Sequence, residues 1–232
     1  MKKKRNRQII YCIFLAVLIL MGLFLKKKSD RTQAVNSQSI LAMQAEELPP
    51  RVALTFDDGP HRIYTRNLLD GLRERGVKAT FFVVGENIPG NEDLIRQMEK
   101  DGHLIGNHTY DHADISKMSD EENCRELRKT SELVKQITGH QTAYVRPPFG
   151  NWKESMDCRI SMIAVKWTID TLDWKSKNVE EIIRKVMQLV SDHDIILMHD
   201  YYATSVEAAF QIVDRLKAEG YEFVTVEDLI LT

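Results

Sequence analysis

Hydrophobic and polar positions along residues 51–232 alternate between two patterns. Short runs rich in β-branched and aromatic residues predict buried strands, and longer stretches with apolar positions three or four residues apart predict amphipathic helices. Seven runs predict strands, at 52–56, 79–84, 103–108, 143–146, 162–169, 194–199 and 221–226. Five stretches predict helices, at 64–75, 91–101, 119–138, 179–191 and 204–219. Alternating strands and helices are typical of an α/β fold with a parallel sheet.

The predicted sheet is smaller than a complete eight-stranded barrel. Such a barrel has eight strand–helix units and about 250 residues, whereas residues 51–232 contain seven predicted strands. We therefore expect a distorted seven-stranded (β/α) barrel, with an open doubly wound sheet as the alternative. Both architectures bring the carboxyl ends of the strands to one edge, where the chemistry of these folds takes place.

The N-terminus has a different pattern. Residues 9–25 form an apolar run without a charge, between the basic segment 1–8 and three lysines. As a helix this run covers about 26 Å, slightly less than the ~30 Å hydrocarbon core, and it predicts one transmembrane helix. A cleavable signal peptide is the alternative. Residues 26–50 are polar, end in two prolines and predict a linker to a domain at 51–232.

Charge is distributed unevenly along the chain. The net charge of the 232 residues is −2, yet residues 1–31 hold nine Lys and Arg against one Asp, and the remainder holds 23 basic and 33 acidic side chains. We do not expect so acidic a domain to bind nucleic acid through its phosphates. Cys12, Cys124 and Cys158 lack the close spacing of a metal site, and we expect free thiols in the domain rather than its one possible disulfide.

Ionisable side chains follow five of the seven predicted strands. The segments concerned are DDGP at 57–60, NHTYDH at 107–112, RPPFG at 146–150, DTLDW at 170–174 and LMHD at 197–200. One such segment is ordinary for a loop, but five at one edge of a sheet indicate a site. Two adjacent carboxylates, Asp57 and Asp58, ionise together most easily beside a cation. Two imidazoles, His108 and His112, with one carboxylate form a facial set for a divalent ion and leave positions open for water and substrate.

The five segments, in this order, resemble the motifs of the polysaccharide deacetylases, also called the NodB-homology or carbohydrate esterase family 4 domain. The resemblance covers about residues 51–230. Members of this family remove N-acetyl groups from peptidoglycan or chitin sugars, or O-acetyl groups from xylan, and have a distorted (β/α) barrel. The resemblance therefore implies a divalent metal cofactor, expected to be Zn²⁺, with Co²⁺, Ni²⁺ or Mn²⁺ as alternatives.

The same resemblance implies a role for each matching position. The metal ligands are expected to be Asp58, His108 and His112. The catalytic residues are expected to be Asp57 as general base, Arg146 orienting that base, His199 as general acid and Asp173 tuning the acid. The substrate-binding residues are expected to be Phe149, whose backbone N–H binds the oxyanion, and Trp174 and Leu197, which line the acetyl pocket.

Amide hydrolysis requires the same functions on physical grounds. It needs an activated water, a stabilised oxyanion and a proton for the departing amine, which a metal ion, a carboxylate base and a protonated imidazole supply together. One departure from the family is the short segment between Gly150 and Ser161, which predicts an abbreviated fourth barrel unit.

The expected function is metal-dependent removal of acetyl groups from N-acetylated sugars of a cell-wall polysaccharide, either peptidoglycan or a chitin-type oligomer. The alternatives are an O-acetyl polysaccharide esterase and an inactive glycan-binding protein. An iron(II) oxygenase uses a similar ligand set, but the Asp57 and Arg146 pair argues against it. Topology follows from the function: a monomer with residues 1–8 in the cytoplasm, a single-pass anchor and an extracellular domain, or a secreted protein after signal cleavage.

Overall fold

The structure is a computed structural model that describes residue 21 and residues 26–27, 48–152 and 161–231. Pro49–Thr232 forms one compact unit. The predicted transmembrane helix at 9–25 lies outside the described residues except for Met21, and so does most of the predicted linker. Among the residues that are described, no helix combines the length and the apolar character needed to cross a membrane.

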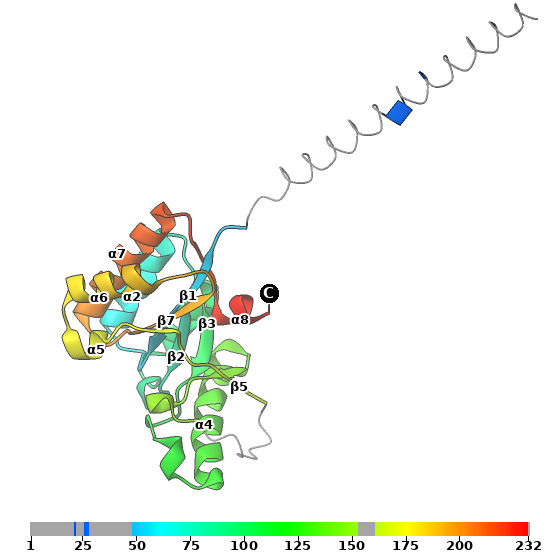
Figure 1. Cartoon of the computed structure of the whole chain (residues 1–232). Coiled ribbons are helices and arrows are strands. Elements are labelled where there is room, and N and C mark those ends of the chain that lie inside the picture. The colour runs from blue at the N-terminus through cyan, green and yellow to red at the C-terminus, as the bar shows by residue number, and fades with distance from the viewer. Residues whose placement is uncertain (1–20, 22–25, 28–47, 153–160, 232) are drawn as a thin grey trace, which may run out of the picture. The chain divides into compact units, whose positions relative to one another are not determined.

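A parallel sheet forms the centre of the unit (Figure 1). Its strands are β1 (Arg51–Asp57), β2 (Thr80–Val83), β3 (Leu104–Asn107), β4 (Tyr144–Val145), β5 (Ile163–Ala164), β6 (Ile169–Asp170), β7 (Asp194–His199) and β8 (Glu222–Phe223). The order is β5-β4-β3-β2-β1-β7-β6, with β8 paired to the start of β1. In this order the end strands β5 and β6 are not neighbours, so the described sheet is a half-barrel rather than a closed one.

The predicted strands are found with two corrections. The predicted strand at 162–169 is two short strands, β5 and β6, with four residues between them that belong to neither. The predicted strand at 221–226 ends at Phe223, because Thr225 caps a short helix, α8 (Val226–Ile230), with its hydroxyl accepting from the N–H of Asp228. The parallel α/β architecture is confirmed. The predicted bounds of these two strands are wrong.

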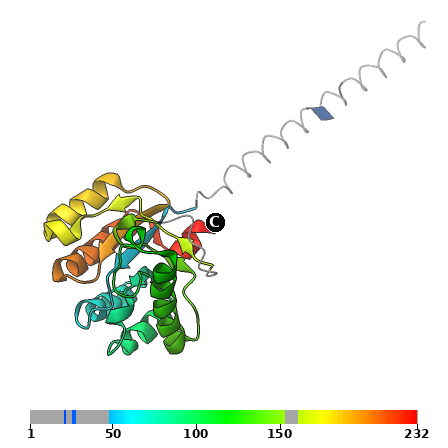
Figure 2. The ribbon, with the colours of Figure 1, turned by 90° about the horizontal axis from the view of Figure 1, so that it is seen from below.

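Helices cover the outer face of the sheet. They are α2 (Tyr64–Glu74), α3 (Glu92–Lys100), α4 (Asp120–Thr138), α6 (Val179–Leu189) and α7 (Ala203–Ala218), all predicted from periodicity, and the short α5 (Asp173–Ser176), which was not. Neighbours contact one another in the order α6, α7, α2, α3, α4, as the view from below also shows (Figure 2). The helical layer therefore follows the curvature of the sheet.

The two faces of the sheet bury different clusters. The main hydrophobic core lies between sheet and helices and includes Val52, Leu54 and Phe56 of β1. Ala53, the next residue along the strand, belongs to a smaller cluster with Val226 and Leu229 of α8, which closes one end of the inner face. Side chains alternate between the faces of a strand. Asp57, at the end of β1, therefore continues the inner row of Ala53 and Thr55.

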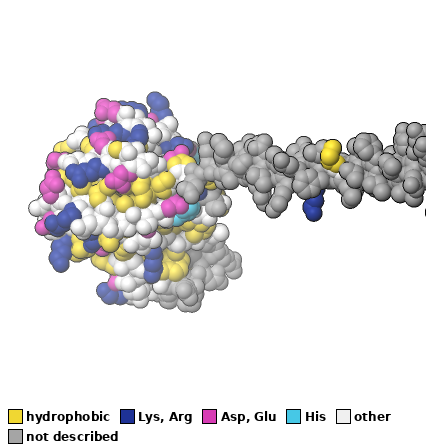
Figure 3. Space-filling model, turned by 45° about the horizontal axis from the view of Figure 1, so that its top comes forward, with side chains coloured by type: hydrophobic (Ala, Val, Ile, Leu, Met, Phe, Trp, Pro, Cys, Tyr) yellow, Lys and Arg dark blue, Asp and Glu magenta, His cyan; other side chains and the backbone are white. Residues whose placement is uncertain are grey.

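Both signs of charge occur on the surface of this unit (Figure 3). On the face drawn in Figure 3, Lys and Arg are interspersed with Asp and Glu around an area of hydrophobic side chains. Cys124 of α4 is disulfide-bonded, so the expectation of free thiols in the domain is wrong for this residue.

Candidate active site

The register of the sheet brings the predicted site residues together. Asp57 pairs with His199 across β1 and β7, and Asn107 pairs with Val145 across β3 and β4. His108 and Arg146, each one residue further along, are consequently side by side. Parallel strands thus place residues from five distant segments at one edge of the sheet.

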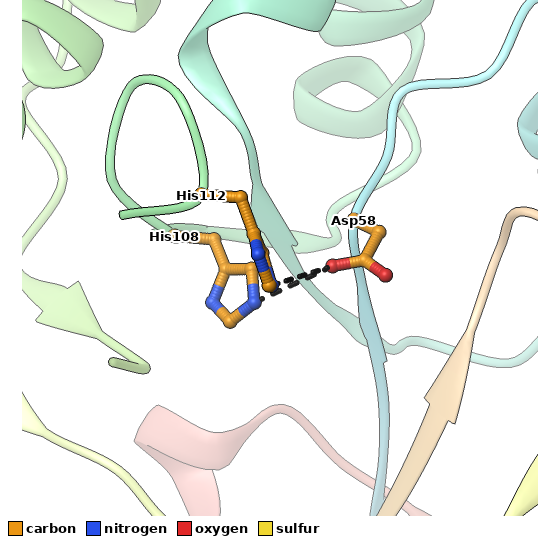
Figure 4. A group of neighbouring side chains, drawn as sticks. All are labelled: Asp58, His108 and His112. Atoms are coloured by element: carbon orange, nitrogen blue, oxygen red, sulfur yellow. Dashed lines mark ion pairs between the residues drawn. The ribbon is translucent and has the colours of Figure 1, made fainter. Parts of the chain in front are cut away.

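Asp58, His108 and His112 form a compact group of possible metal ligands (Figure 4). One donor atom from each residue lies within 4.8 Å of the other two. The Oδ1 atom of Asp58 is 3.5 Å from Nε2 of His108 and 3.4 Å from Nε2 of His112. The sequence predicted these three residues as a ligand set, and the structure brings all three together.

The protonation pattern of this group suits a divalent cation. Nδ1 of His108 lies 2.6 Å from the carbonyl oxygen of Arg146 and donates to it, so the lone pair of Nε2 faces Asp58. Burial lowers the pKa of His112, which favours the neutral imidazole that a metal ligand needs. Among the described residues, the buried Oδ1 of Asp58 has no hydrogen-bond partner. The residues present therefore fit a cation bound by two Nε2 atoms and one carboxylate oxygen.

Asp57 is paired with a fully buried arginine. Arg146 donates through its Nη1 atom to Oδ1 of Asp57 at 2.8 Å and to the hydroxyl of Thr55 at 2.7 Å. Its guanidinium lies over the ring of Phe82, 4.2 Å from the centroid. These contacts fix the Asp57 carboxylate beside the ligand group, with Oδ2 of Asp57 3.8 Å from Nε2 of His108.

His199 and Asp173 form a second pair. His199 lies at the end of β7, beside Asp57 at the end of β1. Nδ1 of His199 is 2.8 Å from Oδ1 of Asp173, while Oδ2 of Asp173 accepts from the backbone N–H of His199 and the hydroxyl of Ser205. Burial raises the pKa of Asp173, but these hydrogen bonds outweigh it and leave the pKa below its usual value. Burial lowers the pKa of His199, yet Asp173 outweighs it and raises that pKa to about 9. His199 is thus a cation at neutral pH.

Replacing Asp173 with asparagine is expected to lower the pKa of His199 from about 9, because burial is then opposed only by the more weakly acting carboxylates of Asp57 and Asp58. Since the folded-state pKa of His199 exceeds its unfolded value, the stabilisation from this pair is complete below pH 6.5 and lost as the pH rises through 9. Imidazole resonances followed by NMR against pH measure the shift.

Asp192→Asn is the matched control for this titration, because Asp192 pairs with the exposed His193 at 2.9 Å, away from the cavity. An Asp173→Asn protein in which His199 still titrates near pH 9 would contradict the assigned cause.

These pairs surround a cavity of about 450 Å³. The predicted substrate-binding residues Phe149, Trp174 and Leu197 all line it. Phe149 has a φ of 60° and meets the ring of His112 edge-on, with centroids 4.9 Å apart. Four further residues line the cavity without having been predicted as substrate-binding from the sequence, namely Pro147, Trp167, Asp170 and Tyr202. Trp167 and Tyr202 lie within a few residues of the DTLDW and LMHD segments. This proximity is the sequence signal that could have indicated them as lining residues.

Side chains distant in sequence hold the loops that carry the ligands, and the sequence pattern did not predict them. Asp58 has a φ of 74°, a left-handed conformation that is unusual for aspartate, and Asn87 donates to its carbonyl at 2.8 Å. Glu126 of α4 accepts from the N–H groups of Tyr110 and Asp111, between the two histidines. At Gly59 an added Cβ would lie 2.2 Å from the carboxylate of Asp200, so the turn after Asp58 requires glycine.

Comparisons with known proteins agree with this geometry. Residues 44–164 match the family model described as polysaccharide deacetylase. The chain is 35% identical to the peptidoglycan-N-acetylglucosamine deacetylase PgdA of Listeria monocytogenes over 209 residues, which is 88% of this chain and 45% of that protein. It thus spans about half the length of this curated relative.

Two solved structures have the same fold. The peptidoglycan deacetylase PdaC of Bacillus subtilis superposes with a TM-score of 0.76 at 35% identity, over 78% of this chain and 90% of that one. A family 4 acetyl xylan esterase from Clostridium thermocellum, solved in complex with a cobalt ion, gives a TM-score of 0.73 at 34% identity, also over 78% and 90%.

Proposed function

Because the chain belongs to the polysaccharide deacetylase family, we propose that it is a metal-dependent hydrolase that removes acetyl groups from N-acetylated sugars of bacterial cell-wall glycan, with the N-acetylglucosamine of peptidoglycan as substrate. The observation that carries this proposal is the convergence of three possible ligands, a base paired with Arg146 and an acid paired with Asp173 on one cavity. The likeness to PgdA supports the choice of glycan.

Asp58, His108 and His112 would hold the cation, which we take to be Zn²⁺. The chemistry that such an ion would supply is a lowered pKa for a bound water and polarisation of the acetyl carbonyl. The donor set of two imidazoles and a carboxylate suits zinc and also cobalt. The cobalt complex of the esterase relative supports a divalent ion in this family.

Asp57 acts as the general base in this proposal. Its carboxylate accepts the proton of the attacking water, and the Nη1 donor of Arg146 keeps the other carboxylate oxygen in place at 2.8 Å. The backbone N–H of Phe149 donates to the developing oxyanion at the rim of the cavity. Trp174 and Leu197 enclose the acetyl methyl group.

His199 acts as the general acid. Its pKa of about 9 keeps the imidazolium protonated at neutral pH, ready to donate to the departing sugar nitrogen as the C–N bond breaks. The products are acetate and the free amine of the sugar. An amine leaving group needs this proton far more than an alkoxide does, which favours N-deacetylation over O-deacetylation.

We also propose that the domain works outside the cytoplasm. The apolar run at 9–25 supports a membrane anchor or a signal peptide. The disulfide at Cys124 supports an oxidising compartment.

Acetate release from N-acetylglucosamine oligomers, with and without a chelator, tests the function. We expect release that stops with the chelator and returns on addition of zinc. Release that persists in protein from which the metal has been removed would overturn the metal dependence. The acetyl xylan esterase relative makes O-acetyl hydrolysis the second candidate, and faster release from acetylated xylan than from the N-acetyl oligomers would favour it.

A further inference from the structure

Aromatic side chains continue from the cavity onto the neighbouring surface. Tyr202 lines the cavity, and its ring meets that of Tyr201 in a T-shaped contact with centroids 5.9 Å apart. Tyr201 meets His61 edge-on at 5.0 Å, and His61 stacks on Tyr64 at 4.5 Å with an interplanar angle of 21°. We call Tyr201, Tyr202 and His61 the aromatic extension. It joins the loop after β7 to the loop before α2.

Tyr201 is 44% exposed although two rings contact it. An aromatic residue that served packing alone would be expected to bury more of its surface. Both ring contacts of Tyr201 are T-shaped, so neighbouring rings support it at an angle instead of lying flat on it. An exposed ring that is supported in this way can contact a ligand while losing little side-chain conformational entropy.

The backbone beneath the aromatic extension is held in place. The hydroxyl of Thr65 donates to the fully buried carboxylate of Asp200, the residue before Tyr201, and accepts from the backbone N–H of His61 at 2.7 Å. The two loops that carry the extension are therefore linked through one threonine. A surface held in this way is organised before a ligand arrives.

The hydrogen bonds of His61 determine which of its ring nitrogens is the donor. Its Nδ1 atom accepts from the backbone N–H groups of Ile63 and Tyr64, both at 3.2 Å. A neutral imidazole whose Nδ1 accepts carries its proton on Nε2. The extension thus combines aromatic rings with an N–H donor, the mixture of apolar area and a few polar groups that is typical of small-molecule sites.

We infer that the aromatic extension is a second sugar-binding site, in which the ring of Tyr201 contacts a pyranose next to the sugar whose acetyl group occupies the cavity. This inference rests on the proposed function. Tyr202 joins the aromatic extension to the cavity, and this continuity favours a glycan as the ligand of the extension. A glycan strand that leaves the cavity reaches the ring of Tyr201 within one sugar length. The C–H face of a pyranose is apolar and electropositive and complements an aromatic face, while its equatorial hydroxyls suit the His61 donor.

The length dependence of turnover tests the inference. The quantity measured is the ratio of kcat/KM for the N-acetylglucosamine pentasaccharide to kcat/KM for the disaccharide. We expect Tyr201→Ala to lower this ratio about tenfold, because the variant loses one aromatic contact with the longer substrate. Tyr201→Phe keeps the ring and is expected to keep the ratio. Leu189→Ala, which removes a 55% exposed side chain at the end of α6, serves as the control for surface truncation.

A ratio that does not change in Tyr201→Ala, or that falls equally in Tyr201→Phe, would overturn the inference. Binding of the pentasaccharide, titrated by fluorescence in an Asp57→Asn background, gives a readout without turnover. Weaker pentasaccharide binding on adding Tyr201→Ala would support the second site even if wild-type protein released no acetate, an outcome in which the proposed function alone fails. Absence of pentasaccharide binding in the Asp57→Asn protein would reject the second site.

Discussion

Replacing His108 with alanine is expected to abolish both stable zinc binding and turnover. His108 is almost completely buried, and its Nδ1–H bond to the Arg146 carbonyl aims Nε2 at Asp58. Removing this ligand leaves two donors, too few for a structured zinc site. We expect bound zinc to fall from about one ion per chain to near zero, and kcat/KM to fall by about 10³-fold or more, because the activated water is lost.

Metal analysis of the purified protein measures the first effect, and acetate release measures the second. His140→Ala is the matched control, since His140 is an exposed histidine whose Nε2 lies 3.7 Å from Glu99, far from the cavity. A His108→Ala protein that keeps one zinc ion per chain at the affinity of the wild type would contradict the proposed ligand set.

Replacing Asp57 with asparagine is expected to abolish turnover while zinc stays bound. The amide keeps an oxygen that can accept from Arg146 but cannot take a proton from water, and a general base contributes about 10²–10⁴-fold to rate. The fully buried Arg146 also loses its anionic partner. Removing one charged member of a buried ion pair costs about 3–5 kcal/mol of folding free energy. Because asparagine retains an oxygen that accepts from Arg146, we expect the loss to lie at the low end of this range or below it.

Zinc content, acetate release and thermal unfolding distinguish the possible outcomes. Loss of zinc in Asp57→Asn would make Asp57 a ligand, contrary to the assignment of Asp58. Asp111→Asn, which changes an exposed carboxylate between the two histidines, is the control and is expected to affect all three measurements much less.

Hydrophobic patterning predicted the long elements of the fold well. Strands β1 and β7 and helices α2, α3, α4, α6 and α7 lie where the pattern placed them, because each buries one face or both in the main core. Short elements were predicted poorly. Four residues separate β5 from β6 inside one apolar run, and the end of the last predicted strand is the capped start of α8. Such boundaries depend on tertiary pairing and on caps more than on hydrophobicity.

The candidate site shows a similar division. Asp57, His108, Arg146, Asp173 and His199 could be named from the sequence because they lie at or shortly after the carboxyl ends of strands, which share one edge. Their roles came from the resemblance of these segments to the polysaccharide deacetylase motifs. Trp167 and Tyr202, which complete the cavity wall, could not be separated from ordinary core or surface aromatics. Their place depends on how far each loop turns after its strand.

The sequence by itself determined the alternation of strands and helices and the chemical groups at the strand ends, since both follow from local order along the chain. Only the tertiary structure decided where those groups point. Asp58, Thr109 and His112 adopt left-handed backbone conformations, which cost energy for residues other than glycine. Hydrogen bonds from Asn87 to the Asp58 carbonyl and from Thr130 to the Thr109 carbonyl offset that cost. These partners are distant in sequence, so the aim of the ligands depends on packing that local sequence does not contain.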